Sequence, residues 1–257
     1  MPQKYIDEFA DLVNIIAKLR GPDGCPWDKK QTHLSLREFL LQESYEVLEA
    51  LDEEDGKKLC QELGDLLLQI ILHARIASEN REFELADVLH NINAKLIRRH
   101  PHIFGDSKVT SAEEVSHNWE EIKKAERSSS SSILEGVPRQ MPGLAYSQEI
   151  QRRAAQAGFD WENIEGVIEK LVEEVNEFQR STCQAERTEE FGDLFFTLVN
   201  VARRMGIDPE ASLRQANRKF YQRFTQMERL CRERGLTLAQ LSFHEQNALW
   251  DEAKKKR

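Results

Sequence analysis

Two pairs of acidic residues recur at helical spacing in the second half of the sequence. Glu174 and Glu177 form an E-x-x-E pattern, and Glu190 and Asp193 form an E-x-x-D pattern. Residues three apart on a helix project from nearly the same face, so each pair presents two carboxylates side by side. A single pair of this kind is common on solvated helices. Whether the pairs indicate a functional site therefore depends on the residues that surround them.

An apolar run follows Asp193 and favours helices that are largely buried. A short connection between two helices makes them antiparallel neighbours, so the E-x-x-E face can meet the E-x-x-D face. Four facing carboxylates out of bulk water cannot all stay ionised without compensation, and a hard cation with oxygen ligands supplies it. We therefore expect a Mg2+ site, with Mn2+ able to substitute. Because Mg2+ commonly binds substrate phosphates as well as carboxylates, the site suits a nucleotide polyphosphate.

The same pattern occurs in the first half of the chain. Residues 62–75 and 190–203 match in register through fourteen positions, and an E-x-x-E pair precedes each stretch. An Asn-x-Lys-x-x-x-Arg pattern follows at 93–99 and at 217–223, and each copy closes with a Trp, at Trp119 and Trp250. Five ordered matches indicate a duplication. The acids of the first copy form a second candidate metal site: Glu43, Glu46, Glu62 and Asp65.

The basic residues of the second copy fit a phosphate site. Lys219 and Arg223 are four apart and share a helical face, where they could neutralise charge on a leaving pyrophosphate. A solvated basic helix is the alternative. Trp250 could stack on a base, although a half-buried packing role explains a single Trp equally well.

The remaining composition favours two tandem all-α domains. Five serines at 128–132, followed by a stretch rich in Gly and Pro, indicate a connection at 128–143 between residues 1–127 and 144–257. The net charge of -9 argues against nucleic acid as a partner. No window is long and apolar enough to cross a membrane and no secretory signal is evident, so we expect a cytoplasmic protein.

A di-iron centre is the competing interpretation of a helical carboxylate cluster. Such a centre requires E-x-x-H on two helices. The sequence has one instance, Glu114 with His117, away from the repeated acids. A redox centre is therefore disfavoured.

These motifs resemble the MazG family of all-α nucleoside triphosphate pyrophosphohydrolases, whose hallmark is E-x-x-E followed by E-x-x-D. The first half adds a G-C-P-W-D motif at 24–28, Q-T-H at 31–33 and the stretch 95–102, and the second adds G-F-D-W at 158–161. The resemblance covers nearly the whole chain. It implies a homodimer that hydrolyses ribo- and deoxyribonucleoside triphosphates to monophosphate and pyrophosphate, as house-cleaning of the nucleotide pool.

The resemblance also assigns roles to residues of the second half. It implies metal binding by Glu174, Glu177, Glu190 and Asp193, and contacts to the nucleotide by Lys170, Lys219, Arg223 and Trp250. Our own hypothesis adds catalysis by Glu173, Lys219 and Arg223, and further nucleotide contacts by Glu173, Glu174, Glu189, Glu190 and Asp193. We expect Glu173 to orient or deprotonate the attacking water.

The first half lacks several of these residues, so we expect it to be the non-catalytic domain. Phe39, Gln42 and Leu72 stand where the second half has Lys170, Glu173 and Asn200. Two alternatives to the house-cleaning function stay open. One is a regulatory module that binds nucleotide or metal, and the other is a narrower pyrophosphohydrolase for dUTP or phosphoribosyl-ATP.

Overall fold

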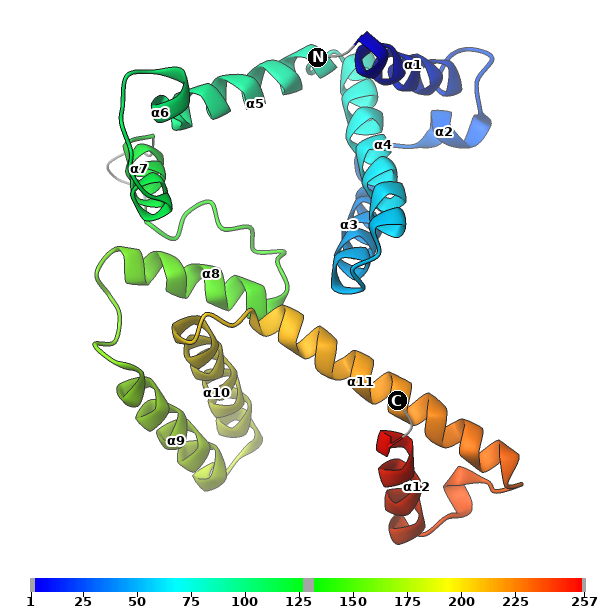
Figure 1. The fold of residues 1–257 in the computed structure, drawn as a ribbon, viewed down its shortest axis with the longest axis vertical. Helices are drawn as coiled ribbons and strands as arrows, with labels where there is room; N and C mark the ends of the chain where they lie inside the picture. Colours follow the sequence, from blue (N-terminus) through cyan, green and yellow to red (C-terminus); the bar gives the residue numbers. More distant parts are fainter. Residues whose placement is uncertain (1–2, 127–131, 256–257) are drawn as a thin grey trace. The chain divides into compact units, whose positions relative to one another are not determined.

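The structure, a computed structural model, describes residues 3–126 and 132–255 of the 257-residue chain. Every regular element in these residues is a helix, which confirms the all-α expectation (Figure 1). The chain divides into two compact units, residues 1–127 and 128–257. None of the described helices is long and apolar enough to span a bilayer.

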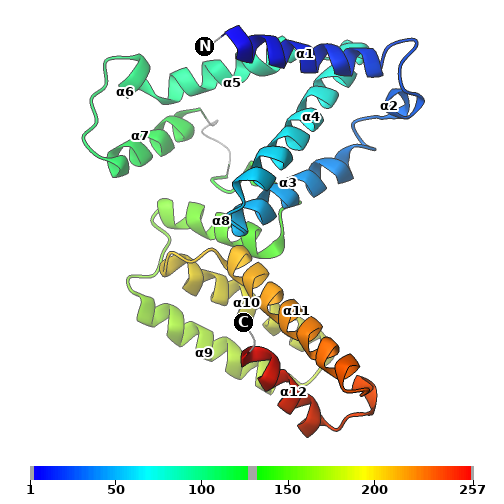
Figure 2. The same cartoon turned by 45° about the vertical axis from the view of Figure 1, so that its right-hand side comes forward.

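The first unit is built around a helical hairpin. Its helices are α1 (Gln3–Leu19), α2 (Pro26–Lys30), α3 (Arg37–Asp52), α4 (Gly56–Asn80), α5 (Leu85–Arg99), α6 (Pro101–Phe104) and α7 (Ala112–Ala125). Helices α3 and α4 lie side by side, and α1 packs on α4 (Figure 2). The core of this unit consists of Ile16, Leu36, Ile71, Leu72 and Ile76.

Polar contacts at the α3–α4 turn fix the register of this hairpin. Asp55 caps α4 by accepting hydrogen bonds from the amides of Lys57 (2.9 Å) and Lys58 (3.1 Å). Such a cap stabilises a helix by about 1 kcal/mol. The Lys58 side chain also forms ion pairs with Glu49 (2.6 Å) and Glu53 (3.0 Å) at the end of α3. The short turn therefore sets the E-x-x-E pair of α3 opposite the E-x-x-D pair of α4.

The second unit repeats this hairpin. Its helices are α8 (Gly143–Gln156), α9 (Ile164–Arg180), α10 (Gln184–Arg204), α11 (Pro209–Glu233) and α12 (Phe243–Lys255), with a 3-10 turn at Leu238–Gln240. Asn163 caps α9 by accepting from the Gly166 amide (3.1 Å), and a three-residue turn leads to α10. Helix α8 packs on α10, where the Gln151 amide donates to the Phe196 carbonyl (2.8 Å).

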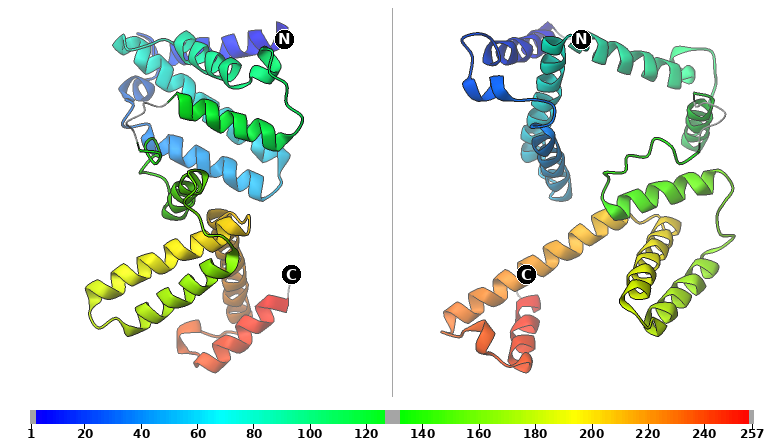
Figure 3. Two further views of the ribbon diagram at one scale, coloured as in Figure 1. Left: turned by 90° about the vertical axis from the view of Figure 1, so that its left-hand side faces the viewer. Right: turned by 180° about the vertical axis from the view of Figure 1, so that it is seen from behind.

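Helix α11 has a different environment from the α9–α10 hairpin. It contacts α8 and α10, but packs mainly on α12, which lies beside its C-terminal part (Figure 3). Met227, Leu230 and Cys231 of α11 form a small core with Leu249 and Ala253 of α12. The second unit therefore consists of two helical hairpins, with α8 packed on the first.

Part of the expected connection at 128–143 packs in the second unit. Residues 128–131 lie outside the described part of the chain. Val137 is buried, and Arg153 of α8 donates to the Glu135 carbonyl (2.7 Å). Because one side chain is buried and one carbonyl is held by an arginine, residues 132–142 are an ordered lead into α8.

Candidate active site

Three acidic residues from α9 and α10 converge in the second unit. Carboxylate oxygens of Glu174, Glu177 and Glu190 all lie within 4.8 Å of one another. Glu174 is buried, and the other two are half-buried. Asp193, the fourth acid of the motif, is exposed and borders a hollow of about 460 Å3 between α8, α10 and the first turn of α11. The structure therefore brings three of the four acids together and leaves Asp193 beside them.

Repulsion from the neighbouring acids disfavours the charged form of Glu190. Burial raises the pKa of Glu190, and the charges of Glu177, Glu174 and Asp193 raise it further. A neighbouring carboxylate raises a pKa because it disfavours the charged form. A divalent cation reverses this cost, so the cluster has the electrostatics of a cation site.

Lys170 brings a positive charge into contact with this cluster. Its ammonium group lies 2.8 Å from Glu173 and 3.0 Å from Glu174, both on α9. These two hydrogen bonds raise the pKa of Lys170 above its ordinary value. The side chain of Glu173 is more than half exposed, as a group that contacts water or substrate would be. Glu189 is also exposed, next to Glu190.

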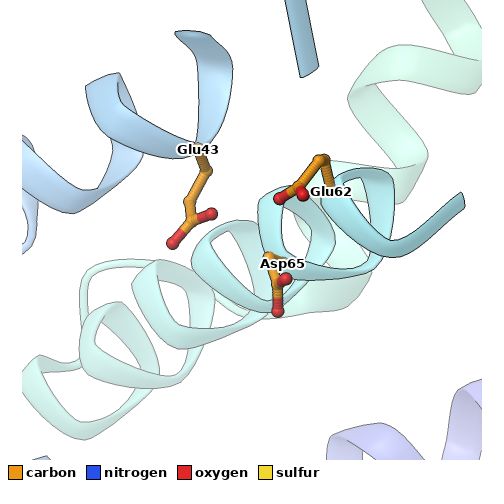
Figure 4. Close-up of side chains that lie close together, drawn as sticks. All are labelled: Glu43, Glu62 and Asp65. Carbon is orange, nitrogen blue, oxygen red and sulfur yellow. The ribbon is translucent and has the colours of Figure 1, made fainter. Parts of the chain in front are cut away.

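A matching cluster lies on the first unit's hairpin. Oxygens of Glu43, Glu62 and Asp65 lie within 4.8 Å of one another, from facing sides of α3 and α4 (Figure 4). Burial first, and then the neighbouring acids, raise the pKa of Glu43 and of Glu62. Glu46 is not one of these three, but it lies beside Glu62 and raises the pKa of Glu62, and it also accepts a hydrogen bond from Gln42 (2.9 Å). Gln42 is the residue that replaces Glu173.

The expected phosphate and base contacts lie on the other hairpin of the second unit. Lys219 and Arg223 are on α11, and Trp250 is on α12, 5.3 Å from the ring of Phe220. No hydrogen bond or ion pair joins these three residues to the acids in the part of the chain that the structure describes. The sequence alone could not show that these residues and the acids lie on different hairpins. A repeated motif does not determine the direction in which the helix that carries it runs.

The apolar face of α10 is only partly covered in a single chain. The expectation that this helix is largely buried is wrong here, since Phe195, Phe196 and Leu198 are each at least 40% exposed. On α11, Phe220 and Tyr221 are 59% and 73% exposed. The physical reason is that a two-helix hairpin covered mainly by α8 leaves other apolar side chains open to solvent. Large exposed apolar patches are in general a feature of interaction faces.

The two residues of the competing di-iron interpretation lie on α7, away from both acidic hairpins in sequence. The side chain of His117 lies outside the described part of the structure, whereas Glu114 accepts hydrogen bonds from Thr110 at the start of α7. Both carboxylate clusters consist of oxygen donors alone. Oxygen-only sites favour Mg2+ or Mn2+ over softer metals.

Sequence reasoning also missed a cavity between α8 and α10. Gln151, Trp161 and Asn200 border a space of about 580 Å3 between α8, residues 159–162 and α10. Asp160 and Arg203 form an ion pair at its edge. Trp161 and Arg203 belong to recurring sequence motifs, which could have indicated that they line a site. Gln151 belongs to no motif, so the sequence did not indicate its place in the cavity wall.

Each unit of the chain matches a known family. Residues 31–104 match the MazG nucleotide pyrophosphohydrolase domain, and residues 147–220 match the phosphoribosyl-ATP pyrophosphohydrolase family. A mazG-related crystal structure from Thermotoga maritima aligns with a TM-score of 0.39 at 34% identity, over 45% of this chain and 98% of that one.

Two relatives that match this chain along nearly its whole length establish its family. The chain is 45% identical over 247 residues to the nucleoside triphosphate pyrophosphohydrolase/pyrophosphatase MazG of Thermotoga maritima, covering 96% of this chain and 95% of that protein. It is 41% identical over 258 residues to the nucleoside triphosphate pyrophosphohydrolase of Escherichia coli, covering 97% and 98%. With this identity along nearly its whole length and two MazG-like acidic hairpins, the chain belongs to the MazG family of nucleoside triphosphate pyrophosphohydrolases.

Proposed function

We propose that this chain hydrolyses ribo- and deoxyribonucleoside triphosphates to monophosphate and pyrophosphate, at the α9–α10 hairpin, as house-cleaning of the cytoplasmic nucleotide pool. The convergence of Glu174, Glu177 and Glu190 beside Lys170 carries the proposal. The first unit has the acids but neither the lysine nor Glu173. Catalysis is therefore assigned to residues 144–257 and not to residues 1–127.

The cluster fits Mg2+, with Mn2+ as a substitute. Ligand oxygens on opposite sides of Mg2+ lie about 4.2 Å apart, because each bond is about 2.1 Å long. The three acids have oxygens within 4.8 Å, so small side-chain movements are enough to bind one ion. When bound, the cation neutralises phosphate charge and lowers the pKa of a water molecule.

The residues beside the cluster act on the water and on the phosphates. Glu173 orients or deprotonates the attacking water, because it is exposed and held next to the cluster by Lys170. Lys170 pairs with Glu174 at 3.0 Å and contacts the triphosphate. If the Glu173→Gln variant retained the wild-type kcat at saturating Mg2+, this role for Glu173 would be wrong.

We infer that a second copy of the chain completes the site. Lys219, Arg223 and Trp250 have no described contact with the acids of their own chain, and exposed apolar side chains lie on both α10 and α11. In a homodimer that covers these side chains, α11 of the partner places Lys219 and Arg223 over the triphosphate, and α12 of the partner places Trp250 there. The acids would then come from one protomer and the arginine from the other.

A mixed dimer tests this arrangement directly. Glu177→Ala and Arg223→Ala chains with different tags are expressed together, and the heterodimer is isolated by both tags. Sites shared between protomers leave one intact site of two, so roughly half of the wild-type activity is expected. Sites contained within one protomer leave none intact, and an inactive heterodimer would refute the shared site.

A substrate panel tests the breadth of the activity. A house-cleaning enzyme cleaves triphosphates carrying several bases, with ribose or deoxyribose, and releases pyrophosphate from each. The match of residues 147–220 to the phosphoribosyl-ATP pyrophosphohydrolase family makes that compound, with dUTP, the necessary comparison. Cleavage of phosphoribosyl-ATP or dUTP alone would replace the broad function with a narrower one.

A further inference from the structure

Two histidines of the first unit face each other through their ring nitrogens. His33 lies in the turn before α3 and His73 lies on α4, and their Nδ1 atoms are 2.7 Å apart. The ring planes differ by 3°, and the ring centres are 5.1 Å apart. Because the contact between the nitrogens and the two ring radii account for nearly all of that separation, the rings meet edge to edge in one plane. Both Nδ1 atoms therefore point at one place between the rings.

The backbone that carries each ring is held in place. The Thr32 amide donates to Ser35 Oγ (2.9 Å), and the Ser35 amide donates to Thr32 Oγ1 (3.1 Å), which closes the turn around His33. His73 lies well inside the 25-residue helix α4. The two rings are therefore presented by fixed backbone, as a pre-organised binding site requires.

The outer nitrogens of the two rings are buried, and neither makes a directed hydrogen bond within the described part of the chain. Glu82 Oε2 lies 3.5 Å from His33 Nε2, which is too long for a strong hydrogen bond. Asn80 fixes this carboxylate by donating to its other oxygen (3.2 Å). Gln69, one helical turn before His73, is 5% exposed, and its Oε1 is buried without a partner among the described residues. Each ring is therefore accompanied by an oxygen acceptor.

This arrangement favours a cation between the rings. In a neutral pair, one ring donates its Nδ1 proton to the other, and its own Nε2 is then a lone pair beside an oxygen acceptor. A metal ion held by both Nδ1 atoms places a proton on both Nε2 atoms, so both acceptors can be satisfied. Burial, and then the neighbouring ring of His33, lower the pKa of His73. The neutral ring is the form that binds a metal ion.

The donor atoms favour a transition metal over Mg2+. Imidazole nitrogen suits Zn2+ and its neighbours, whereas Mg2+ prefers oxygen. Two nitrogens bound to a tetrahedral Zn2+ lie roughly 3.4 Å apart, because each bond is about 2.0–2.1 Å long. The Nδ1 atoms need to separate by roughly 0.7 Å from their present 2.7 Å, which small ring rotations provide. The side chain of His33 is 37% exposed, so the ion and its remaining water ligands can enter from that side.

We propose that His33 and His73 bind Zn2+, or a related divalent transition-metal ion, through their Nδ1 atoms. Glu82 and Gln69 then accept hydrogen bonds from the outer nitrogens. Metal-bound histidines typically donate their other N–H to a carboxylate or a carbonyl in this way. The ion ties the turn before α3 to the middle of α4.

This site is separate from the carboxylate cluster and belongs to the first unit. His73 is eight residues after Asp65 on α4, or about 12 Å along the helix axis. In the fourteen-position register between the units, Val201 takes the place of His73. Residues 128–257 contain a single histidine, His244, so the second unit cannot form such a pair. The inference is therefore independent of the proposed triphosphate hydrolysis.

Zinc binding by the metal-stripped full-length protein tests the site. Zn2+ is titrated against a competing zinc-binding dye, in excess Mg2+ that occupies the carboxylates. His73→Val introduces the second unit's residue, and His90→Gln changes an exposed histidine of α5 as the matched control. We expect wild type and His90→Gln to bind one Zn2+ with equal affinity, and His73→Val to bind it at least about a hundredfold more weakly. Glu82→Gln should weaken binding by about tenfold or more, as loss of the partner of a metal-bound histidine does.

The coordination of the bound ion gives an independent result. X-ray absorption at the zinc edge of the one-to-one complex should show imidazole nitrogen ligands at about 2.0–2.1 Å. Equal Zn2+ affinity in wild type and His73→Val would overturn the proposal, as would a complex with oxygen ligands alone. If His73→Val fails to fold, His33→Asn, at the partly exposed ring, must show the same loss. A pair that holds only a proton would leave the melting temperature of wild type unchanged by Zn2+, and that result would also refute the site.

Discussion

Replacing Glu190 with Gln should change stability in opposite directions with and without Mg2+. In the metal-free protein Glu190 lies among carboxylates that raise its pKa, after burial, so its charge opposes folding. Removing that charge should raise the melting temperature. With Mg2+ present, the same charge binds the cation, so its removal should lower the melting temperature relative to wild type.

The size of the Mg2+ effect follows from mass action. A cation at a hundred times its dissociation constant stabilises the folded state by about 2.7 kcal/mol. For a unit of about 125 residues this corresponds to an increase in Tm of roughly 10 °C. The Glu190→Gln variant should lose most of this increase in the transition of the second unit.

Differential scanning calorimetry of the full chain, with EDTA and with Mg2+, measures both effects. Glu169→Gln, which removes the same charge from an exposed position of α9, is the matched control and should keep the Mg2+ response. A Glu190→Gln protein that responded to Mg2+ as wild type does would refute the interpretation of these acids as cation ligands.

Three further predictions concern the framework. A Cβ at Gly24 would lie 2.1 Å from the Leu19 carbonyl oxygen, so Gly24→Ala should destabilise the first unit by roughly 3 kcal/mol or more in urea melts, whereas Gly56→Ala, which meets no atom within 4 Å, should not. Asn163→Ala removes the α9 cap and should cost about 1 kcal/mol by the same assay; an unchanged midpoint would contradict the capping role. Hydrogen bonds from Arg152 and Arg153 lower the pKa of Glu149 from 4.5 to about 2. The stability that these hydrogen bonds contribute is present above the unfolded pKa and is lost as the pH falls from about 4.5 towards 2. Wild type should therefore lose more stability across that pH range than Glu149→Gln does.

Helical periodicity was enough to predict the hairpins and the facing acids. Residues three apart share a face, and a short turn forces neighbouring helices to be antiparallel, so Glu174 and Glu190 had to approach each other once both segments were helical. The duplication strengthened the prediction because the first unit repeats every step.

The environment of these elements could not be predicted from spacing. Burial of α10 depends on which surfaces cover it, and in one chain Phe195 and Phe196 stay open. The direction of α11, which separates Arg223 from the acids, depends on tertiary packing against α12. The unpaired oxygen of Gln151 depends on a contact with Phe196, 45 residues away in the sequence. Each of these features arises from long-range packing, which local patterns do not encode.

Product analysis on three proteins tests the central claim most directly. Wild type, Glu177→Ala and Glu46→Ala are incubated with nucleoside triphosphates and Mg2+, and the products are separated by ion-exchange chromatography. We expect monophosphate and pyrophosphate from wild type and from Glu46→Ala, and a rate at least about a hundredfold lower from Glu177→Ala. Loss of cleavage in Glu46→Ala with wild-type activity in Glu177→Ala would move the active site to the first unit and contradict the account.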